Sequence, residues 1–259
     1  VNHPVKLDIA GSIKSISKIT KELLYDCYHT FYTPSNMVVV VVGDLVPEEV
    51  FSIVENMIKF KDRGKVEKKY PEEPEHLNKE YNEQKLVVSM PLFYMGIKDN
   101  VRVSGLELLK RRTALSIVLN DILGRSSELY NRLYEDGLIN DTFRFEASID
   151  KAYGFVAFGG QSPDPKKTAE IISSALNEAT DKGISEESFS RILKAHQGMY
   201  VRSFNAVDII AREITDSYFN DASYFDIGRV YEELDIAYIK KVISEVFINK
   251  PALSVINPQ

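Results

Sequence analysis

The sequence of 259 residues has one cysteine, four histidines and no long apolar run. Cys27 alone cannot form a disulfide within the chain, which fits a reducing compartment such as the bacterial cytoplasm. The longest purely apolar run, Met37 to Val42, is far too short to cross a bilayer. The first twenty residues carry charges without the central apolar block of a signal peptide. We therefore expect a cytoplasmic protein without a membrane partner.

An excess of positive charge is also missing. The formal net charge of -6 argues against a nucleic-acid-binding protein, which is usually basic. Apolar residues make up 44% and charged residues 27%, as in an ordinary globular protein with a sizeable core. The length suits one and a half to two domains. Because the chain begins with Val1 instead of methionine, we expect it to be a piece of a longer protein.

The first sixty residues predict helices around one strand. Residues 12–32 are largely helical, with Thr20 as an N-cap before apolar residues at helical spacing. The β-branched run 37–42 predicts a strand that is buried on both faces. Pro47 then opens a helix that extends to about Lys59.

Residues 61–83 are rich in Lys, Glu, Pro and Asn and predict a linker. A second folded unit, 84–259, opens with an expected strand at Lys85 to Met90. Ser104 and Glu107 form a capping-box pattern before a helix that ends at Gly124.

The rest of the second unit predicts a hairpin followed by helices. Apolar residues alternate with polar ones over 142–149, and the chain returns through Phe155 to Gly160, which indicates an antiparallel pair with one buried face. Further helices are expected at 127–137, 165–182, 186–204, 206–219 and 236–247, before a short strand at 252–256. This order of elements predicts an α+β fold.

The two ends of the chain match without a gap at a shift of 215 positions. Thr20 falls on Asp235, both as N-caps, and an amphipathic helix, a short break and a buried strand follow each of them. Matched positions include Leu24 with Ile239, Cys27 with Val242, Tyr28 with Ile243, Phe31 with Val246, Val38 with Leu253 and Val40 with Val255. Any helix–turn–strand could show such a pattern, but the gapless register across both elements favours a duplicated unit.

Several motifs resemble those of the insulinase/pitrilysin zinc peptidases, and of small bacterial cytoplasmic members in particular. In the first part these are His3-Pro4, Ile9-Ala10-Gly11-Ser12, Ser15-Ile16, Phe31-Tyr32-x-Pro34-Ser35-Asn36-Met37 and Val41-Val42-Gly43-Asp44. In the second they are Gly124-x-Ser126-Ser127, Leu133-Tyr134-Glu135, and Tyr153-Gly154-Phe155 leading to Gly159-Gly160.

The resemblance implies repeated α+β units, with antiparallel sheets packed by helices in a two-layer, metallohydrolase-like sandwich, that enclose a chamber for peptides. It implies that residues 1–60 are the tail of the first, catalytic unit, that 61–83 link the units, and that 84–259 form the second, non-catalytic unit. In the family a His-x-x-Glu-His helix and a further glutamate bind zinc. Three protein ligands leave the metal a position for water, which the glutamate of the motif deprotonates.

This chain departs from the family at that motif. Its histidines are His3, His29, His76 and His196, and no two of them lie four residues apart. In relatives the zinc helix and third glutamate precede the segment that matches His3-Pro4. We therefore expect this chain to hold no catalytic and no metal-binding residue and no cofactor, while the full-length parent binds zinc. The residues that contact substrate are not assigned.

Each remaining polar candidate has a plain interpretation. We expect His3 in a loop, His29 on the polar side of its helix, His76 in the linker and His196 packed near Ile192 and Leu193. Cys27 lies on the apolar stripe, which predicts a buried and inert thiol. Cys27 and His29 do not face each other, since they are two positions apart on a helix. The run Lys110-Arg111-Arg112 predicts a solvated helix face.

Some distant relatives grip the substrate backbone with an arginine–tyrosine pair in the non-catalytic half. Those positions align with Ala157 and Thr168, so the pair is expected to be missing here. The exposed edge of the 142–160 hairpin could add a strand to a peptide, or it could simply pack within a sheet.

Three hypotheses follow. The parent is an active zinc endopeptidase or oligopeptidase in which this chain shapes part of the chamber. Alternatively, it is a non-catalytic binding or scaffolding subunit that partners an active peptidase. In the third, the chain is an unrelated α+β binding domain with a chance match. We expect a homo- or hetero-oligomer, and expect an exposed apolar face in the first unit to promote self-association.

Overall fold

The computed structural model describes residues 2–59 and 61–259, and the chain divides into two compact units. The first consists of residues 1–73 together with 204–216, and the second of residues 74–203 together with 217–259. Each unit is considered by itself below.

The first unit contains short helices. They are α1 (Ile13–Ile16), α2 (Lys21–Phe31), α3 (Pro47–Met57) and the 3-10 turns η1 (Pro4–Lys6) and η2 (Pro34–Asn36). The side chain of Thr20 caps α2 by accepting a hydrogen bond of 3.2 Å from the N–H of Leu23, as its sequence position predicts. Pro47 occupies the first turn of α3, where its missing N–H costs no hydrogen bond.

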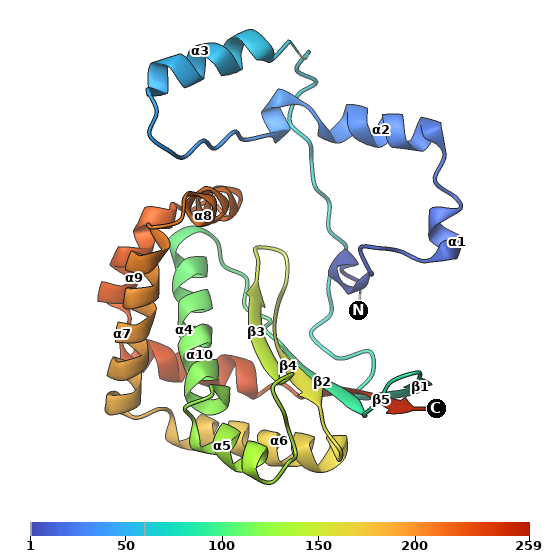
Figure 1. The fold of residues 1–259 in the computed structure, drawn as a ribbon, viewed down its shortest axis with the longest axis vertical. Coiled ribbons are helices and arrows are strands. Elements are labelled where there is room, and N and C mark those ends of the chain that lie inside the picture. The colour runs from blue at the N-terminus through green and yellow to red at the C-terminus, as the bar shows by residue number, and fades with distance from the viewer. Residues whose placement is uncertain (1, 60) are drawn as a thin grey trace. The chain divides into compact units, whose positions relative to one another are not determined.

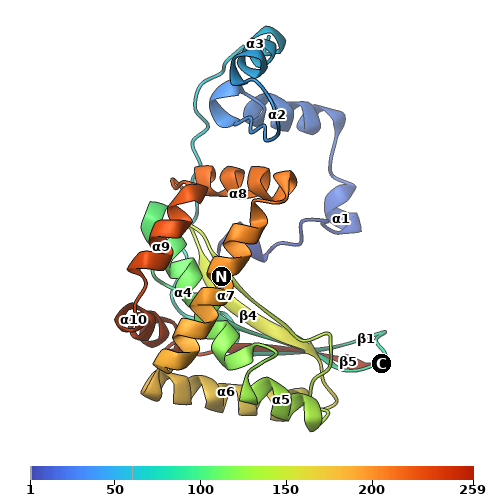
Figure 2. The same cartoon turned by 60° about the vertical axis from the view of Figure 1, so that its left-hand side comes forward.

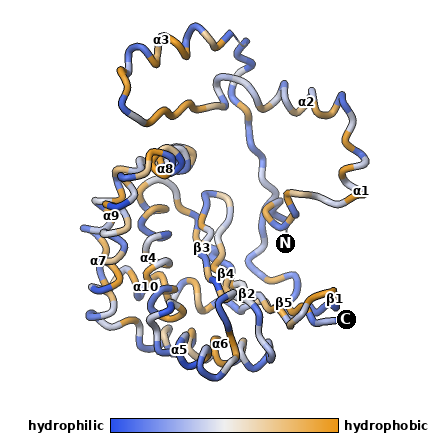
Figure 3. Tube along the Cα trace, in the orientation of Figure 1, coloured by the Kyte–Doolittle hydropathy of each residue, from blue (hydrophilic) through white to orange (hydrophobic). Residues whose placement is uncertain are grey.

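The strand predicted at Met37–Val42 is absent, and that prediction is wrong for the structure. The segment has no secondary structure, and no strand lies beside it within the described residues. Its side chains alternate between exposed and half-buried, and the run stands out as apolar before α3 in Figure 3. A β-strand requires a neighbour to satisfy its backbone N–H and C=O groups, so the valines alone do not make one.

The second unit is built on a five-stranded sheet of order β1-β5-β2-β4-β3 (Figure 1). The strands are β1 (Tyr81–Leu86), β2 (Leu92–Lys98), β3 (Arg144–Ile149), β4 (Gly154–Gln161) and β5 (Ala252–Pro258). β1 and β5 are parallel, and all other neighbours are antiparallel. The predicted hairpin corresponds to β3 and β4, and the α+β class is confirmed.

The start of this sheet differs from the prediction. A strand was expected at Lys85 to Met90, but β1 ends at Leu86, and Val87 is exposed in the connection to β2. The apolar pair Val87-Val88 favours a strand locally, yet Pro91 has no N–H to give to a ladder. β2 follows Pro91 and was not predicted.

Helices cover one face of the sheet. They are α4 (Gly105–Leu123), α5 (Glu128–Glu135), α6 (Pro165–Lys182), α7 (Glu186–Ser203), α9 (Ile227–Glu233) and α10 (Ile236–Phe247), while α8 (Val207–Phe219) begins in the first unit and ends in the second. α4, α6 and α10 share one core with the inward side chains of the sheet, which include Phe93, Met95 and Phe158. Figure 2 shows these three helices and the sheet from a second side. No helix in the described ranges is long and apolar enough to span a membrane.

The start of α4 does not use the predicted capping box. Ser104 occupies the N-cap position, but its side chain makes no capping hydrogen bond. Glu107 instead accepts a hydrogen bond of 2.6 Å from the hydroxyl of Tyr238 on α10. The Glu107 carboxylate therefore joins α4 to α10 and does not cap the first turn of α4.

Candidate functional site

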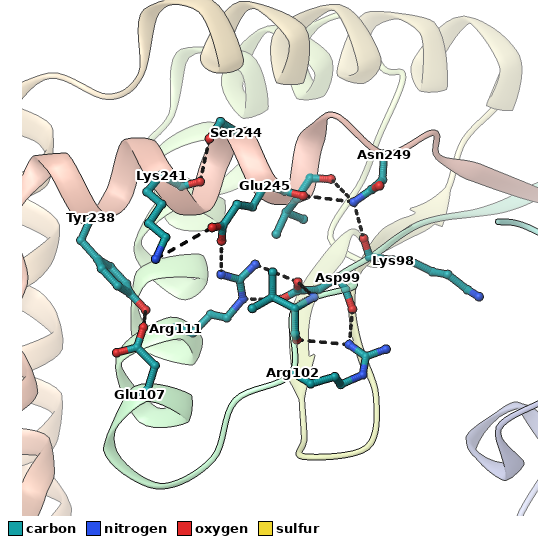
Figure 4. Close-up of polar contacts among 12 residues, drawn as sticks. Lys98, Asp99, Arg102, Glu107, Arg111, Tyr238, Lys241, Ser244, Glu245 and Asn249 are labelled. Carbon is teal, nitrogen blue, oxygen red and sulfur yellow. Dashed lines mark hydrogen bonds and ion pairs between the residues drawn. The ribbon is translucent and has the colours of Figure 1, made fainter. Parts of the chain in front are cut away.

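A buried ion pair joins α4 to the end of β2. Arg111 of α4 is 2% exposed and Asp99 is fully buried, and the guanidinium donates two hydrogen bonds to the Asp99 carboxylate (Figure 4). Arg111 also donates to Glu245 of α10. Burial opposes the charge of Arg111, but its hydrogen bonds to Asp99 and Glu245 outweigh this effect and raise its pKa.

The prediction of a solvated face at Lys110-Arg111-Arg112 is therefore wrong. Arg111 is buried, and its two neighbours are only half-exposed. Arg112 donates a hydrogen bond of 2.8 Å to the carbonyl of Ile149, and the ammonium of Lys110 lies 4.8 Å from the ring centroid of Tyr238. The groups that these three cationic side chains contact come from other parts of the chain.

Asp99 also fixes the backbone where β2 ends and β4 begins. Its N–H donates to the carbonyl of Gly154 at 2.9 Å, and its carboxylate accepts from the N–H of Val101 at 3.0 Å. A Cβ at Gly154 would lie 3.0 Å from the Asp99 side chain, so the glycine permits this approach. Helices α4 and α10 are thus tied to the sheet, and the sheet presents its other face in a defined position.

The face of the sheet opposite α4, α6 and α10, called the polar sheet face below, carries polar side chains together with apolar ones such as Leu92 and Ile256. Alternation along each strand places one row of side chains there across all five strands: Asn82, Ser254, Tyr94, Gly159 and Arg144. Tyr94 is 50% exposed, and Arg144 and Glu146 on the edge strand β3 are exposed. A sheet face of this kind offers hydrogen-bonding groups and an aromatic ring to a polypeptide.

Small residues leave the middle of this face smooth. Ala252, Gly96 and Ala157 are aligned across β5, β2 and β4. Gly159, also on this face, allows the backbones of β4 and β2 to lie close together, because a Cβ there would lie 2.1 Å from the carbonyl oxygen of Phe93. On the same face, Tyr94 and Lys98 flank Gly96 along β2, and Glu146 lies opposite Ala157.

A groove of about 550 Å³ lies on the other face, between α6 and the strands β1, β2 and β5. Its floor includes Met95 and Leu253, and its rim includes Glu80 and Lys166. The Lys166 ammonium lies 5.2 Å from the ring centroid of Tyr81. The lining residues contain neither histidine nor cysteine.

The donors of the chain do not fit a zinc ion. In the described parts of the chain, no three His, Cys, Asp or Glu side chains are grouped as a metal site requires. His3 caps η1, with Nδ1 accepting from the N–H of Val5 at 3.1 Å, and stacks on Tyr70 at 5.0 Å. His29 stacks with Tyr25 on α2, and His76 is exposed before β1.

His196 lies on α7 beside the buried Ile192. Burial lowers its pKa from the ordinary value of 6.5. Within the described structure, its Nε2 atom is buried without a hydrogen-bond partner, while its backbone carbonyl accepts from the hydroxyl of Tyr231 at 3.3 Å. The ring is packed in the unit and not directed at a shared site with other donors.

Cys27 was predicted to be buried, and the structure shows the opposite. It is exposed on α2, as are Leu24 and Phe31 of the same apolar stripe. The stripe exists as the sequence indicates, but its side chains are exposed.

The two positions aligned with the substrate-gripping pair of distant relatives lie in different surroundings. Ala157 lies on the polar sheet face and carries only a methyl group. Thr168 is fully buried on α6, where its hydroxyl contacts Ser162 at 2.9 Å and the carbonyl of Asp164 at 2.9 Å. The structure therefore gives Thr168 a role in packing. The Asp99–Arg111 pair was missed because it depends on how α4 packs on the sheet, and the polar sheet face was missed because it depends on strand pairing.

Comparison with known proteins identifies the family. Residues 18–195 match the model described as the peptidase M16 inactive domain. The chain is 38% identical over 247 residues to YmfH of Bacillus subtilis, an uncharacterized zinc protease, which covers 94% of this chain and 58% of YmfH. It is 21% identical over 264 residues to YmxG of the same organism, also an uncharacterized zinc protease, covering 99% of this chain and 62% of YmxG. The chain thus spans less than two thirds of either relative.

A solved structure of an M16-like peptidase from Alicyclobacillus acidocaldarius has the same fold, with a TM-score of 0.92 and 29% identity over all of this chain and 63% of that one. The resemblance to insulinase-type zinc peptidases is confirmed by these matches. The chain belongs to the peptidase M16 inactive domain family.

Proposed function

We propose that this chain is the rear part of a zinc-dependent peptidase, and that it shapes a chamber in which the full-length protein hydrolyses peptides. In this proposal residues 1–60 are the tail of the catalytic unit, 61–83 are the linker, which leads into β1 at Tyr81, and 84–259 are the non-catalytic unit. The zinc belongs to the full-length parent, as in relatives named zinc proteases. This chain contributes no catalytic residue.

One observation carries the proposal. The chain matches the inactive-domain model and is 38% identical to a zinc protease, yet the donors among its described residues do not fit a metal. A part that shapes the enclosure, while another part performs hydrolysis, accounts for both facts.

The polar face of the sheet is the proposed chamber wall. Its exposed Tyr94, Arg144 and Glu146 surround the smooth centre made by Gly96 and Ala157. Backbone amides of an extended peptide would find donors and acceptors there, while small residues leave room for varied side chains. The partner in this proposal is a peptide, within a homo- or hetero-oligomer in the reducing bacterial cytoplasm, which suits a lone cysteine.

A chimera tests this proposal. The stretch of YmfH that matches this chain is replaced by the chain itself, and the purified chimera is compared with intact YmfH and with the chain alone. We expect the chimera and YmfH to hold stoichiometric zinc and to cleave a fluorescence-quenched, unstructured peptide. The chain alone should do neither. A chimera that folds and binds zinc without cleaving a peptide that YmfH cleaves would contradict the proposed chamber role.

The alternative is a non-catalytic subunit that binds or scaffolds an active peptidase. The lack of fitting metal donors in this chain is compatible with it. It predicts that intact YmfH-like relatives retain peptide binding without hydrolysis. Measuring peptide binding by fluorescence anisotropy beside cleavage in the same samples separates the two functions.

A further inference from the structure

A small pocket of the second unit lies beside the start of the edge strand β3. Its volume is about 340 Å³, and its lining residues come from the end of α4, the turn that follows it, α5 and the start of β3: Leu123, Arg125, Tyr130, Phe143, Arg144 and Phe145. Two of these six residues are cationic and none is anionic, in a chain whose formal net charge is -6. The charge of the lining therefore favours an anionic ligand.

Apolar and aromatic side chains form the walls of this pocket. Phe143 and Tyr130 are 4% and 8% exposed, and their rings meet edge to face with centroids 6.2 Å apart. Leu123, the last residue of α4, is buried and belongs to the same core. Packing holds these walls in place, and their low polarity strengthens the attraction between the cations and a bound anion.

The polar groups of the pocket keep hydrogen-bond donors available. Arg125 is 69% exposed, and its contact of 3.9 Å with Asp141 contributes little. Arg144 donates from Nη1 to the carbonyls of Asp141 and Phe143, while its Nε and Nη2 have no partner among the described residues. The hydroxyl of Tyr130 likewise makes no hydrogen bond to a described residue, and it is not a buried atom. A ligand in the pocket can therefore accept hydrogen bonds.

The strand beside the pocket has a free edge. Within the described sheet, β3 is the outermost strand and pairs only with β4 (Figure 1). One row of its backbone N–H and C=O groups thus has no strand beside it. Arg144 is the first residue of β3, so a peptide that pairs antiparallel with this edge brings its C-terminal end to the pocket.

We infer that this pocket binds the C-terminal carboxylate of a peptide that adds to the edge of β3. The carboxylate accepts hydrogen bonds from Arg125 and Arg144, whose planar guanidinium groups match its two oxygens. The last side chain of the peptide lies against Phe143 and Tyr130. A free edge next to the two cations favours a polypeptide over a small free anion. This inference rests on the proposed function, since it narrows the peptides to those with a free C-terminus.

Fluorescence anisotropy with the purified chain tests the inference. The probe is the peptide Ser-Thr-Val-Ser-Thr-Val-Ser-Leu with fluorescein at its N-terminus and a free C-terminal carboxylate. The matched probe has the same sequence and a C-terminal amide. We expect the carboxylate form to bind at least about tenfold more tightly.

A third probe separates the two sources of a carboxylate. It ends in an amidated Glu in place of Leu, so its negative charge lies on a side chain. We expect it to bind as weakly as the amidated Leu probe. Binding as tight as that of the free C-terminus would overturn the assignment to a main-chain carboxylate.

Matched variants locate the binding. Arg125→Gln removes a cation from an exposed position and should reduce the preference for the carboxylate probe to roughly twofold or less. Arg191→Gln removes the same charge from an exposed position on α7 and should leave the preference unchanged. Arg144→Gln should act like Arg125→Gln, with circular dichroism as the check of folding. If Arg144→Gln does not fold, the exposed Arg125 still decides the result.

The outcomes separate this inference from the proposed function. Equal affinity for the carboxylate and amide probes overturns the inference, as does a preference that Arg125→Gln leaves intact or a chain that binds none of the probes. Cleavage by the chimera with YmfH decides the proposed function in each of these cases. A carboxylate preference that depends on Arg125, in a chain whose chimera does not cleave, supports the pocket while the proposed function fails.

Discussion

The guanidinium of Arg111 donates from Nε and Nη2 to the two carboxylate oxygens of Asp99, at 2.6 and 2.8 Å. This bidentate pair is buried, and the residues lie on α4 and at the end of β2. Its Asp99 end also binds backbone groups at Val101 and Gly154. One ion pair therefore connects a helix, two strands and a loop of the second unit.

Arg111→Met should destabilise the second unit by about 3–5 kcal/mol, because Asp99 would remain charged and buried without its partner. Urea unfolding followed by circular dichroism measures the change. Lys182→Met removes one partner of the exposed pair with Glu178 and serves as control, with no measurable change expected. Equal stability of Arg111→Met and wild type would contradict the assignment.

Gly159→Ala should cost about 1–3 kcal/mol, because the added Cβ would lie 2.1 Å from the carbonyl of Phe93 and must push β2 and β4 apart. Gly96→Ala is the matched control on the neighbouring strand, where the nearest atom is Val156 O at 3.8 Å. Thermal unfolding of both variants should show a large loss for the first and little for the second. The reverse order would show that the sheet face is not packed as described.

Stability should also depend on pH through His196. Burial lowers its pKa below the ordinary 6.5. Between the two values the unfolded chain binds more protons than the folded chain, so stability is intact above that window and falls as the pH falls through it. His196→Leu should therefore lose less stability than wild type between about pH 7 and about pH 5. Parallel urea titrations at both pH values measure this, and identical losses would contradict the prediction.

The chain alone should hold no tightly bound zinc, because its histidines and Cys27 are not grouped. Inductively coupled plasma mass spectrometry after dialysis gives the metal content. Stoichiometric zinc that survives dialysis would overturn both this prediction and the proposed division of labour.

The chain alone should also self-associate through the exposed stripe of α2. Leu24→Lys places a charge on that stripe and should shift sedimentation profiles toward the monomer. Thr30→Lys adds the same charge elsewhere on the helix and should not. A strictly monomeric wild-type profile at high concentration would count against a role of this surface in association.

Local signals in the sequence predicted most helices and their ends. Thr20 and Asp235 act as N-caps as expected, and Pro165 and Gly183 mark the ends of α6. Strands were less predictable, since Val87-Val88 has strand-like composition but lies in a connection, and 37–42 lacks neighbours. Pairing decides both cases, and pairing is not a local property.

The candidate site was also predictable only where local signals decide it. That the chain holds no metal site stays a prediction from the spacing of its histidines, and the structure places these histidines in separate surroundings. The burial of Arg111 was not predicted, because its partners Asp99 and Glu245 are 12 and 134 positions away. The exposure of Cys27 was not predicted either, because a stripe of apolar residues does not reveal whether anything covers it.

The inner position of β5 has a consequence for how the second unit is made. β1 and β2 are close in sequence, but they are joined in the sheet only through β5, which is synthesised far later. During synthesis, the backbone groups of β1 and β2 that pair with β5 stay without these partners until Ala252–Pro258 leaves the ribosome. Pairing between strands that are so far apart in the sequence predicts that the sheet is completed slowly. Until then, chaperones could bind the unpaired strands of the nascent chain.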